Sequence, residues 1–570
     1  MLLANSFLYE ACLDWVESLK AEPDSCVDAI SKTALQAWYY NPGRFADGAL
    51  ENRAFRLGLD EYRQVTGAVP RMELNPGRKA RTLHVVTEVY PVGGHTRFLV
   101  KWILRDRNSA HAAVLTQQLG PLPGFFEQAI AKAGGGLLCL PPSESKISRA
   151  TQLRNLSKEF DRVVLHSHPN DPIPILAFAS KDLPPVAMFN IGHFSFSLGS
   201  TVSDLVINTA DYFESVSKKF RYARRTIRLT TLAGLNPLGS ELVDKESAKS
   251  QLGFDSSARV VMTIASEHYF RPIAGYNFFL TSSRLLKAIP DIHLIVVGVP
   301  STSSLIPLEL RENCRCHFPG TAVNPEPYYH AADLCLESFP MPSLGGLVES
   351  VAHGEAFPVP VYGVGESILR VQLSPLLTFS YRPRDEEDYV DYIARLILDL
   401  PGTREQARQL RLSILQYDQD FGQHLDNLNQ TIDRLSHEPG EIGSSGLIDS
   451  YDTRTLAQLN FSDLTLAARI DELLPFDRAV RSQFLAIAKG LVSPREGAGR
   501  ISHRLSDKEN SIAERDKAIR WLRDELNKFR LEARNSLQIV HELETAVESL
   551  STDSLNEKSG HLGGELAEPA

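Results

Sequence analysis

The chain has 570 residues, 43% of them hydrophobic and 23% charged, and a formal net charge of −10. This length provides for several domains with large cores. The acidic balance gives no support to nucleic-acid binding, which favours basic surfaces. The sequence shows no run of about 18 apolar residues, so we expect no membrane-spanning helix.

The six cysteines are scattered along the chain and show no spacing typical of a zinc site. We therefore predict reduced thiols, as in a cytoplasmic protein. The amino terminus has no basic start, and acidic residues break its apolar run, so it does not read as a signal peptide.

Residues 1–78 are predicted to form a helical N-terminal segment. Leu8, Cys12, Trp15 and Leu19 recur at the spacing of one helix face. The tripeptide Asn41-Pro42-Gly43 is a strong turn signal.

Residues 79–232 alternate between short apolar, β-branched runs and helical patterns, which predicts a Rossmann-like domain with a parallel sheet. Predicted strands cover residues 82–89, 112–116, 137–140, 163–165 and 184–189, and residues 202–208 close the unit. Residues 233–436 repeat the pattern, with strands at 259–265 and 292–298. A last helix, over 404–435, is expected to pack back on the first domain.

Polar residues follow three of these strands, at the sheet edge where α/β proteins bind ligands. Gly93, Gly94 and His95 follow the first strand. His168 follows the strand at 163–165, with His166 and Asp171 close by, and His193 follows the strand at 184–189. The alternatives are a helix cap by Thr96, histidines that satisfy only the backbone, and a metal site.

The most informative stretch runs from Tyr328 to Glu366. It predicts a strand at 334–336, a turn with two adjacent glycines, a helix from Leu347, and a further strand from Pro358. Ser343, Gly345 and Gly346 lie in this turn. A glycine turn that leads into a helix can bind an anion through its free N–H groups. Glu349 is expected in the first helical turn, where its carboxylate can accept a hydrogen bond from a ligand hydroxyl. The alternative is an ordinary crossover that binds no ligand.

The run E-S-V-A-H-G-E-A-F-P-V resembles the donor-binding segment of retaining GT-B glycosyltransferases of the family 4 type, with two extra residues between glycine and proline. S-F-P-M-P-S-L-G-G resembles the corresponding turn of the O-GlcNAc-transferase-like branch. Met341 stands where the retaining branch has a second glutamate. The resemblance spans residues 81–435 and implies two Rossmann-like domains that face each other across a cleft.

The resemblance also implies roles for individual residues. The glycine turn, with Gly93 and Gly94 across the cleft, would bind a nucleotide-sugar donor, Arg271 would neutralise its diphosphate, and Glu349 would hold the ribose. Arg97 could supply the second cation, since the family's arginine position falls near Ser266.

His168 would contact the sugar, with His95 and His193 as further candidates. The implied reaction is hexosyl transfer to a hydroxyl acceptor without a metal or other cofactor, and the setting that the resemblance suggests is bacterial polysaccharide or protein glycosylation. Two alternatives stay open: a nucleotide-sugar epimerase of the same shape, and an inactive scaffold.

The C-terminal part has a different character. Residues 437–500 read as a linker with short helices. Residues 501–552 carry apolar residues every seventh position, which predicts a coiled coil and hence a homo-oligomer or a partner protein. The alternative is a long helix that docks on its own chain. Residues 553–570 read as a disordered tail. The apolar positions are Leu505, Ile512, Ile519, Leu526, Ala533, Val540 and Val547.

Overall fold

The computed structural model describes residues 2–41, 44–62, 79–91, 94–190, 195–230, 243–272, 276–322, 324–340, 343, 345–363, 376–377, 379 and 381–443. The predicted coiled coil at 501–552, the tail at 553–570 and most of the segment at 437–500 lie outside the described residues.

Three helices open the described chain: α1 (Leu2–Ser18), α2 (Pro23–Tyr40) and α3 (Gly48–Tyr62). Their apolar faces share one buried cluster with the helices and strands of the first sheet, in which Ile30 packs with residues such as Leu153 and Ile175. Residues 2–62 of the predicted helical segment at 1–78 thus form helices that contribute to the first hydrophobic core, whereas residues 63–78 lie outside the described residues.

The first sheet has seven parallel strands in the order β3-β2-β1-β4-β5-β6-β7. The strand order reverses between β1 and β4, which makes the carboxyl ends of these two strands the natural ligand position. The strands are β1 (Ala80–Val86), β2 (Ser109–Leu115), β3 (Leu137–Cys139), β4 (Arg162–His166), β5 (Val186–Phe189), β6 (Leu205–Asn208) and β7 (Thr226–Arg228), and the helices are α4 (Gly94–Arg105), α5 (Gly124–Lys132), α6 (Lys146–Ser157), α7 (Ile173–Ala177) and α8 (Asp211–Phe220).

The second sheet has five parallel strands in the order β10-β9-β8-β11-β12, with its reversal between β8 and β11. Its strands are β8 (Arg259–Ile264), β9 (Ile292–Val297), β10 (Cys316–Gly320), β11 (Leu334–Leu336) and β12 (Phe357–Val359), and its helices are α9 (Lys245–Gln251), the 3-10 turn η1 (Glu267–Phe270), α10 (Phe278–Ala288), α11 (Leu308–Arg311), α12 (Glu326–Ala331), α13 (Gly345–Gly354) and α14 (Glu386–Leu398).

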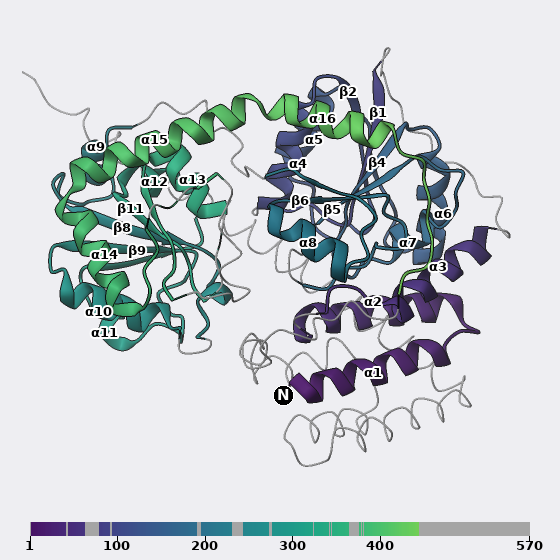
Figure 1. Cartoon of the computed structure of the whole chain (residues 1–570), viewed down its shortest axis with the longest axis horizontal. Coiled ribbons are helices and arrows are strands. Elements are labelled where there is room, and N and C mark those ends of the chain that lie inside the picture. The colour runs from purple at the N-terminus through teal and green to yellow at the C-terminus, as the bar shows by residue number, and fades with distance from the viewer. Residues whose placement is uncertain are drawn as a thin grey trace, which may run out of the picture. The chain divides into compact units, whose positions relative to one another are not determined.

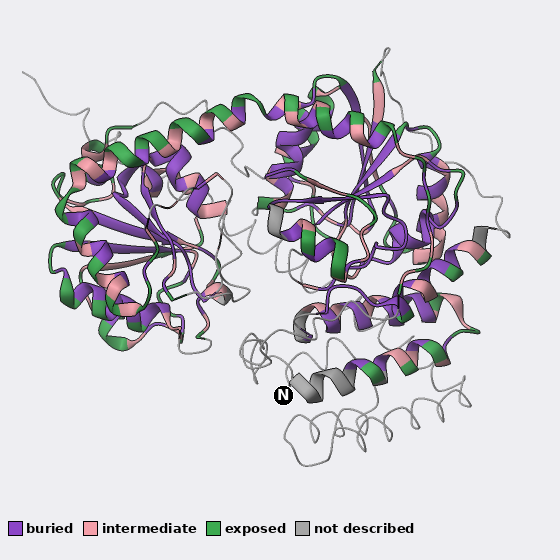
Figure 2. Cartoon of the chain, in the orientation of Figure 1, coloured by how far each residue is buried: buried purple, intermediate pink, exposed green. Residues whose placement is uncertain are grey.

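Helices cover both parallel sheets, and the central strands are mostly buried (Figures 1 and 2). The predicted fold class, an α/β chain with two Rossmann-like sheets, is confirmed. Residues 316–320 form strand β10, a segment for which no strand was predicted from the sequence. Since β10 lies at the edge of its sheet, Pro319 removes no hydrogen bond from a central ladder.

Two long helices close the second half: α15 (Leu400–Gln419) and α16 (Phe421–Asp433). Asp399 separates α14 from α15, and Pro401 lies in the first turn of α15, where its missing N–H costs no helical bond. A second break, at Asp420, divides the predicted helix at 404–435 into α15 and α16. Phe421, Leu425 and other apolar residues of α16 pack with Trp102 of α4, which confirms that this helix returns to the first sheet.

The described chain ends in a strap, residues 437–443, that is held to the first half by hydrogen bonds. The His437 ring contacts Asp204 through Nδ1 and the Phe178 carbonyl through Nε2, each at 2.8 Å. Further along, the Ile442 N–H donates to the side chain of Asn52 on α3 at 2.9 Å. The last described residues therefore meet the first helices.

Candidate functional site

The glycine turn after β11 is braced by a buried carboxylate. Glu337 is 2% exposed, and its Oε1 accepts hydrogen bonds from the N–H of Ser343 at 2.8 Å and from the N–H of Ser338 at 3.1 Å. The Ser343 hydroxyl donates to the same oxygen at 3.3 Å. The carboxylate therefore fixes the entry to helix α13 before any ligand arrives.

The two predicted glycines have different surroundings. A Cβ on Gly346 would lie 2.6 Å from the Ile264 side chain and 3.0 Å from the Ile264 carbonyl oxygen, at the end of β8. A Cβ on Gly345 would have nothing within 4 Å among the described residues. Gly346 is thus required for the turn to approach the central strand, whereas no described residue crowds Gly345. Gly345 begins α13, a helix of ten residues, whose first N–H groups have no partner within the helix.

Glu349 lies in the second turn of α13, and the prediction that it lies in the first turn is wrong. The helix begins at Gly345, before the apolar repeat that was used to place its start. The Tyr329 hydroxyl donates to Glu349 Oε2 at 3.0 Å. Burial raises the pKa of Glu349, while this hydrogen bond and the positive charges of Arg97 and Lys101 act in the opposite direction.

Arg271 follows η1, on the chain segment that leaves the end of β8. It is half-buried, and among the described residues no hydrogen bond or ion pair is recorded for its side chain. Its proposed contact with a diphosphate stays a prediction. Arg97, named as a possible second cation, acts electrostatically on both Glu349 and Tyr329.

The carboxyl edge of the first sheet positions His168. The Thr87 hydroxyl oxygen, just after β1, accepts the His168 N–H at 2.8 Å and donates to Asp171 at 2.7 Å. Asp171 also accepts from the Thr116 hydroxyl at 2.5 Å and from the Ile173 N–H at 3.0 Å. The Asp171 carboxylate is therefore engaged in holding three strand ends together, which argues against the alternative of a metal site built on it.

His168 and His95 are both held as neutral rings. The His168 ring stacks on Tyr90 with centroids 5.9 Å apart, and burial lowers the pKa of His168 against the opposing charges of Asp171 and Glu88. His95 lies in the first turn of α4, where burial and the neighbouring His168 lower its pKa to about 4. Two neutral imidazoles at one sheet edge can each donate one hydrogen bond and accept another at neutral pH.

The structure supports the alternative role of Thr96 as a helix cap only in part. Its hydroxyl oxygen accepts the Tyr90 N–H at 2.9 Å, so it ties the preceding loop to α4. Gly94 is the first residue of α4. Gly93 and His193 lie outside the described residues, and their predicted roles are untested.

Several residues of this region were not identified as important from the sequence. Glu337 stands directly after a predicted strand, which was the available signal, but it was considered only as a misplaced second glutamate. The buried Asp418 of α15 binds Lys101 and Arg105 of α4, the latter at 2.7 Å. Nothing in the sequence connects these positions, which are more than 300 residues apart.

No family model matches the chain, and no curated protein matches it. Solved structures do: the O-GlcNAc transferase of Thermobaculum terrenum (a mutant) is 16% identical, covers 74% of this chain and 81% of its own, with a TM-score of 0.46. The Anabaena protein HepE, solved with UDP, is 15% identical over 62% of this chain and 100% of its own, with a TM-score of 0.45.

The UDP-GlcNAc 2-epimerase of Neisseria meningitidis, solved with UDP-GlcNAc, is 13% identical over 62% of this chain and 99% of its own, with a TM-score of 0.41. At these identities and TM-scores, the likeness does not tell which reaction this chain performs. Among the described residues, no helix is both long and apolar enough to cross a bilayer. The chain is similar to solved proteins that include an O-GlcNAc transferase. Its own two parallel sheets have the α/β architecture that the GT-B resemblance implied.

Proposed function

We propose that this chain is a glycosyltransferase of the hexosyltransferase type, which moves a sugar from a nucleotide-sugar donor to a hydroxyl acceptor. The observation that carries the proposal is the braced glycine turn. Glu337 holds Ser343 in place, and Gly346 lets the turn touch the end of β8. An anion-binding turn formed in advance costs no reorganisation when the ligand binds.

The leaving diphosphate would bind at the start of α13. Negative charge grows on it as the glycosidic bond breaks, and the N–H groups of the turn together with Arg271 and Arg97 would stabilise that charge. These groups replace the charge of a metal ion, so the proposal requires no metal. Glu349 Oε2 already accepts from Tyr329, which leaves Oε1 as the oxygen for a ribose hydroxyl.

The sugar and the acceptor hydroxyl would lie near His168 and His95, with His193 as a third candidate. The low pKa of both described histidines keeps them neutral at physiological pH, so each can accept a hydrogen bond from the sugar or the acceptor hydroxyl. We propose a cytoplasmic reaction, with an acceptor in bacterial polysaccharide or protein glycosylation.

The test is binding of UDP, GDP and ADP to the full chain by calorimetry, with Glu349→Gln as the site variant. Glu312→Gln is the matched control, an exposed glutamate beside the second sheet. We expect one nucleotide to bind wild type and the control alike, and the site variant at least about 10-fold more weakly, since a hydrogen bond to a charged group contributes about 1.5–3 kcal/mol.

Equal binding to wild type and Glu349→Gln, or no binding of any nucleotide, would overturn the proposed donor site. Incubation with the sugar form of the bound nucleotide then tests the reaction. Release of nucleoside diphosphate supports a transferase, whereas interconversion of the donor sugar without an acceptor supports the epimerase.

A further inference from the structure

Three buried histidines form a diagonal line across the first sheet. His84 on β1 lies between His166 on β4 and His111 on β2, and all three rings are 0% exposed. His84 Nδ1 is 3.1 Å from His166 Nε2, and His84 Nε2 is 3.0 Å from His111 Nδ1. The strand register explains the line. The β1 residue opposite His166 lies two positions after His84, and the β1 residue opposite His111 lies two positions before it.

One end of this line sets the direction of every hydrogen bond. His111 Nε2 is 3.1 Å from the backbone carbonyl oxygen of Asp106. A carbonyl can only accept, so in a neutral ring His111 carries its proton on Nε2 and leaves Nδ1 as an acceptor. His84 must then donate from Nε2, and His166 must likewise donate from Nε2. The lone pair at the other end of the line therefore lies on His166 Nδ1.

That last nitrogen is buried and has no hydrogen-bond partner among the described residues. The same is true of His95 Nε2, and the rings of His95 and His166 lie 5.9 Å apart. Leaving two buried polar nitrogens unsatisfied costs free energy. A donor that sits between them, or direct approach of the two rings, would remove this cost and extend the line to the candidate sugar site.

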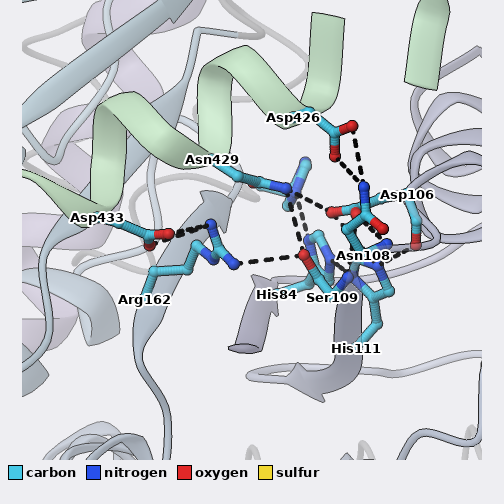
Figure 3. A network of polar contacts seen from close by, with 10 residues as sticks. His84, Asp106, Asn108, Ser109, His111, Arg162, Asp426, Asn429 and Asp433 are labelled. Atoms are coloured by element: carbon cyan, nitrogen blue, oxygen red, sulfur yellow. Dashed lines mark hydrogen bonds and ion pairs between the residues drawn. The ribbon is translucent and has the colours of Figure 1, made fainter. Parts of the chain in front are cut away.

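The opposite end reaches a carboxylate held by helix α16. Asp106 Oδ2 lies 3.6 Å from His111 Nε2 and accepts from the side chain of Asn429 at 2.6 Å (Figure 3). Arg162 bridges Ser109 and Asp433 beside it, with the Asp433 carboxylate at 3.0 Å. The rings therefore connect the site edge of the sheet to an acidic group at the far end.

We propose that His166, His84 and His111 form a proton relay between His95 at the candidate sugar site and Asp106. A proton added at His166 Nδ1 releases the proton on His166 Nε2 to His84 Nδ1. His84 then passes its Nε2 proton to His111 Nδ1, and His111 passes its Nε2 proton to the Asp106 carboxylate. Three N–H bonds form on the line as three break. His95 gives the entering proton from Nε2 and takes one on its other ring nitrogen from the acceptor hydroxyl, so the O–H bond that forms at Asp106 balances the O–H bond that breaks at the hydroxyl.

The source of the proton, the acceptor hydroxyl, rests on the proposed function, whereas the relay itself rests on the geometry. Burial lowers the pKa of His84 and of His166 well below the usual value, and nearby rings and Arg162 act on His84 in the same direction. At His111 the Asp106 carboxylate opposes burial and Arg162. Burial therefore disfavours a resting positive charge on each of the three rings.

The first test is independent of activity. In the full chain labelled with ¹⁵N-histidine, the ring nitrogens of His84, His111 and His166 are assigned by single substitutions. We expect all three to be neutral and protonated on Nε2 between pH 6 and pH 8. A resting ring protonated on Nδ1, or a charged ring in this pH range, would overturn the relay whatever the chain catalyses.

The second test separates a relay from a structural network. His84→Gln keeps an acceptor oxygen for His166 and an N–H donor for His111, but an amide cannot pass a proton on. The matched control is His293→Gln, since His293 Nδ1 pairs with His317 Nε2 at 3.2 Å in the second sheet. With the sugar form of the nucleotide that binds, we expect His84→Gln to lower kcat about 10-fold or more with little change in KM.

The control should keep the wild-type kcat. Unchanged kcat in His84→Gln, with an unchanged solvent isotope effect, would overturn the relay and leave the proposed transferase function intact. If wild type turns over no donor, the proposed function fails and the ring protonation measured above still decides the relay.

Discussion

The Tyr329 hydroxyl donates a hydrogen bond of 3.0 Å to Glu349 Oε2, and so links α12 to α13 beside the glycine turn. Tyr329 is 1% exposed, so this bond is protected from water. It orients the carboxylate and leaves Oε1 for a ligand. The two residues act as one unit in the proposed ribose contact.

Tyr329→Phe should therefore weaken nucleotide binding without touching the ligand itself. The loss of one hydrogen bond to a carboxylate is worth about 1–2 kcal/mol, so we expect the Kd to rise by about 5- to 30-fold. Calorimetry measures it, with Tyr328→Phe as the control on the same helix. A Kd that stays at the wild-type value would show that Tyr329 does not orient the ribose contact.

The glycine pair provides a matched comparison of stability. Gly346→Ala must push against Ile264, and overpacking of this kind typically costs about 1–3 kcal/mol. Gly345→Ala meets no described atom within 4 Å and should leave the midpoint of thermal unfolding nearly unchanged. Thermal unfolding of both variants checks the difference. Equal midpoints would mean that the turn does not need its close approach to β8.

Much of this fold could be predicted from the sequence, because buried parallel strands appear as apolar, β-branched runs. The strands at 137–140 and 163–165 were placed within a residue of β3 and β4. Helix starts were less certain, and the start of α13 moved Glu349 by one turn. Glycines begin this helix, and they carry no apolar pattern that would mark its first residue.

Contacts between side chains on different strands could not be predicted from the sequence. His84 and His111 sit in strand-like runs that predict burial, but only the register of β1 against β2 and β4 brings their rings to hydrogen-bond distance. The same limit applies to Asp418, whose partners lie on a helix of the other half. Sequence spacing shows which residues share an element, whereas it does not show which elements meet.

We expect the buried Asp418, which joins α15 to α4, to contribute strongly to the stability of the folded chain. Asp418→Asn would leave Lys101, which is 3% exposed, without its anionic partner. Breaking a buried pair from one side typically costs about 3–5 kcal/mol. We expect a large drop in the midpoint of thermal unfolding, and almost none in Asp420→Asn, an exposed neighbour. A small effect at Asp418 would show that water reaches this pair.

Glu51 on α3 should make stability depend on pH. Burial raises its pKa to about 7 from a usual 4.5, although the N–H groups of Thr201 and Gly199 oppose the rise. The folded chain therefore holds this proton more tightly than the unfolded chain. Stability should fall as pH rises from about 4.5 to about 7 and then level off, by roughly 3 kcal/mol in total.

Glu51→Gln carries no titrating group and should remove this part of the pH dependence, whereas Glu17→Gln, on the exposed face of α1, should retain it. Thermal unfolding between pH 5 and pH 8 measures both variants against wild type. Parallel curves for wild type and Glu51→Gln would contradict the assignment.

Because α16 and the strap at 437–443 pack against the first half, noncovalent contacts join the two halves in addition to the backbone. If the backbone were severed between residues 230 and 243, the pieces would still be joined by the α16 contacts with Trp102 and by the bond between Ile442 and Asn52. A nicked molecule should migrate as one species under native conditions and as two in denaturant. The same arrangement would let separately expressed fragments reconstitute the complete protein.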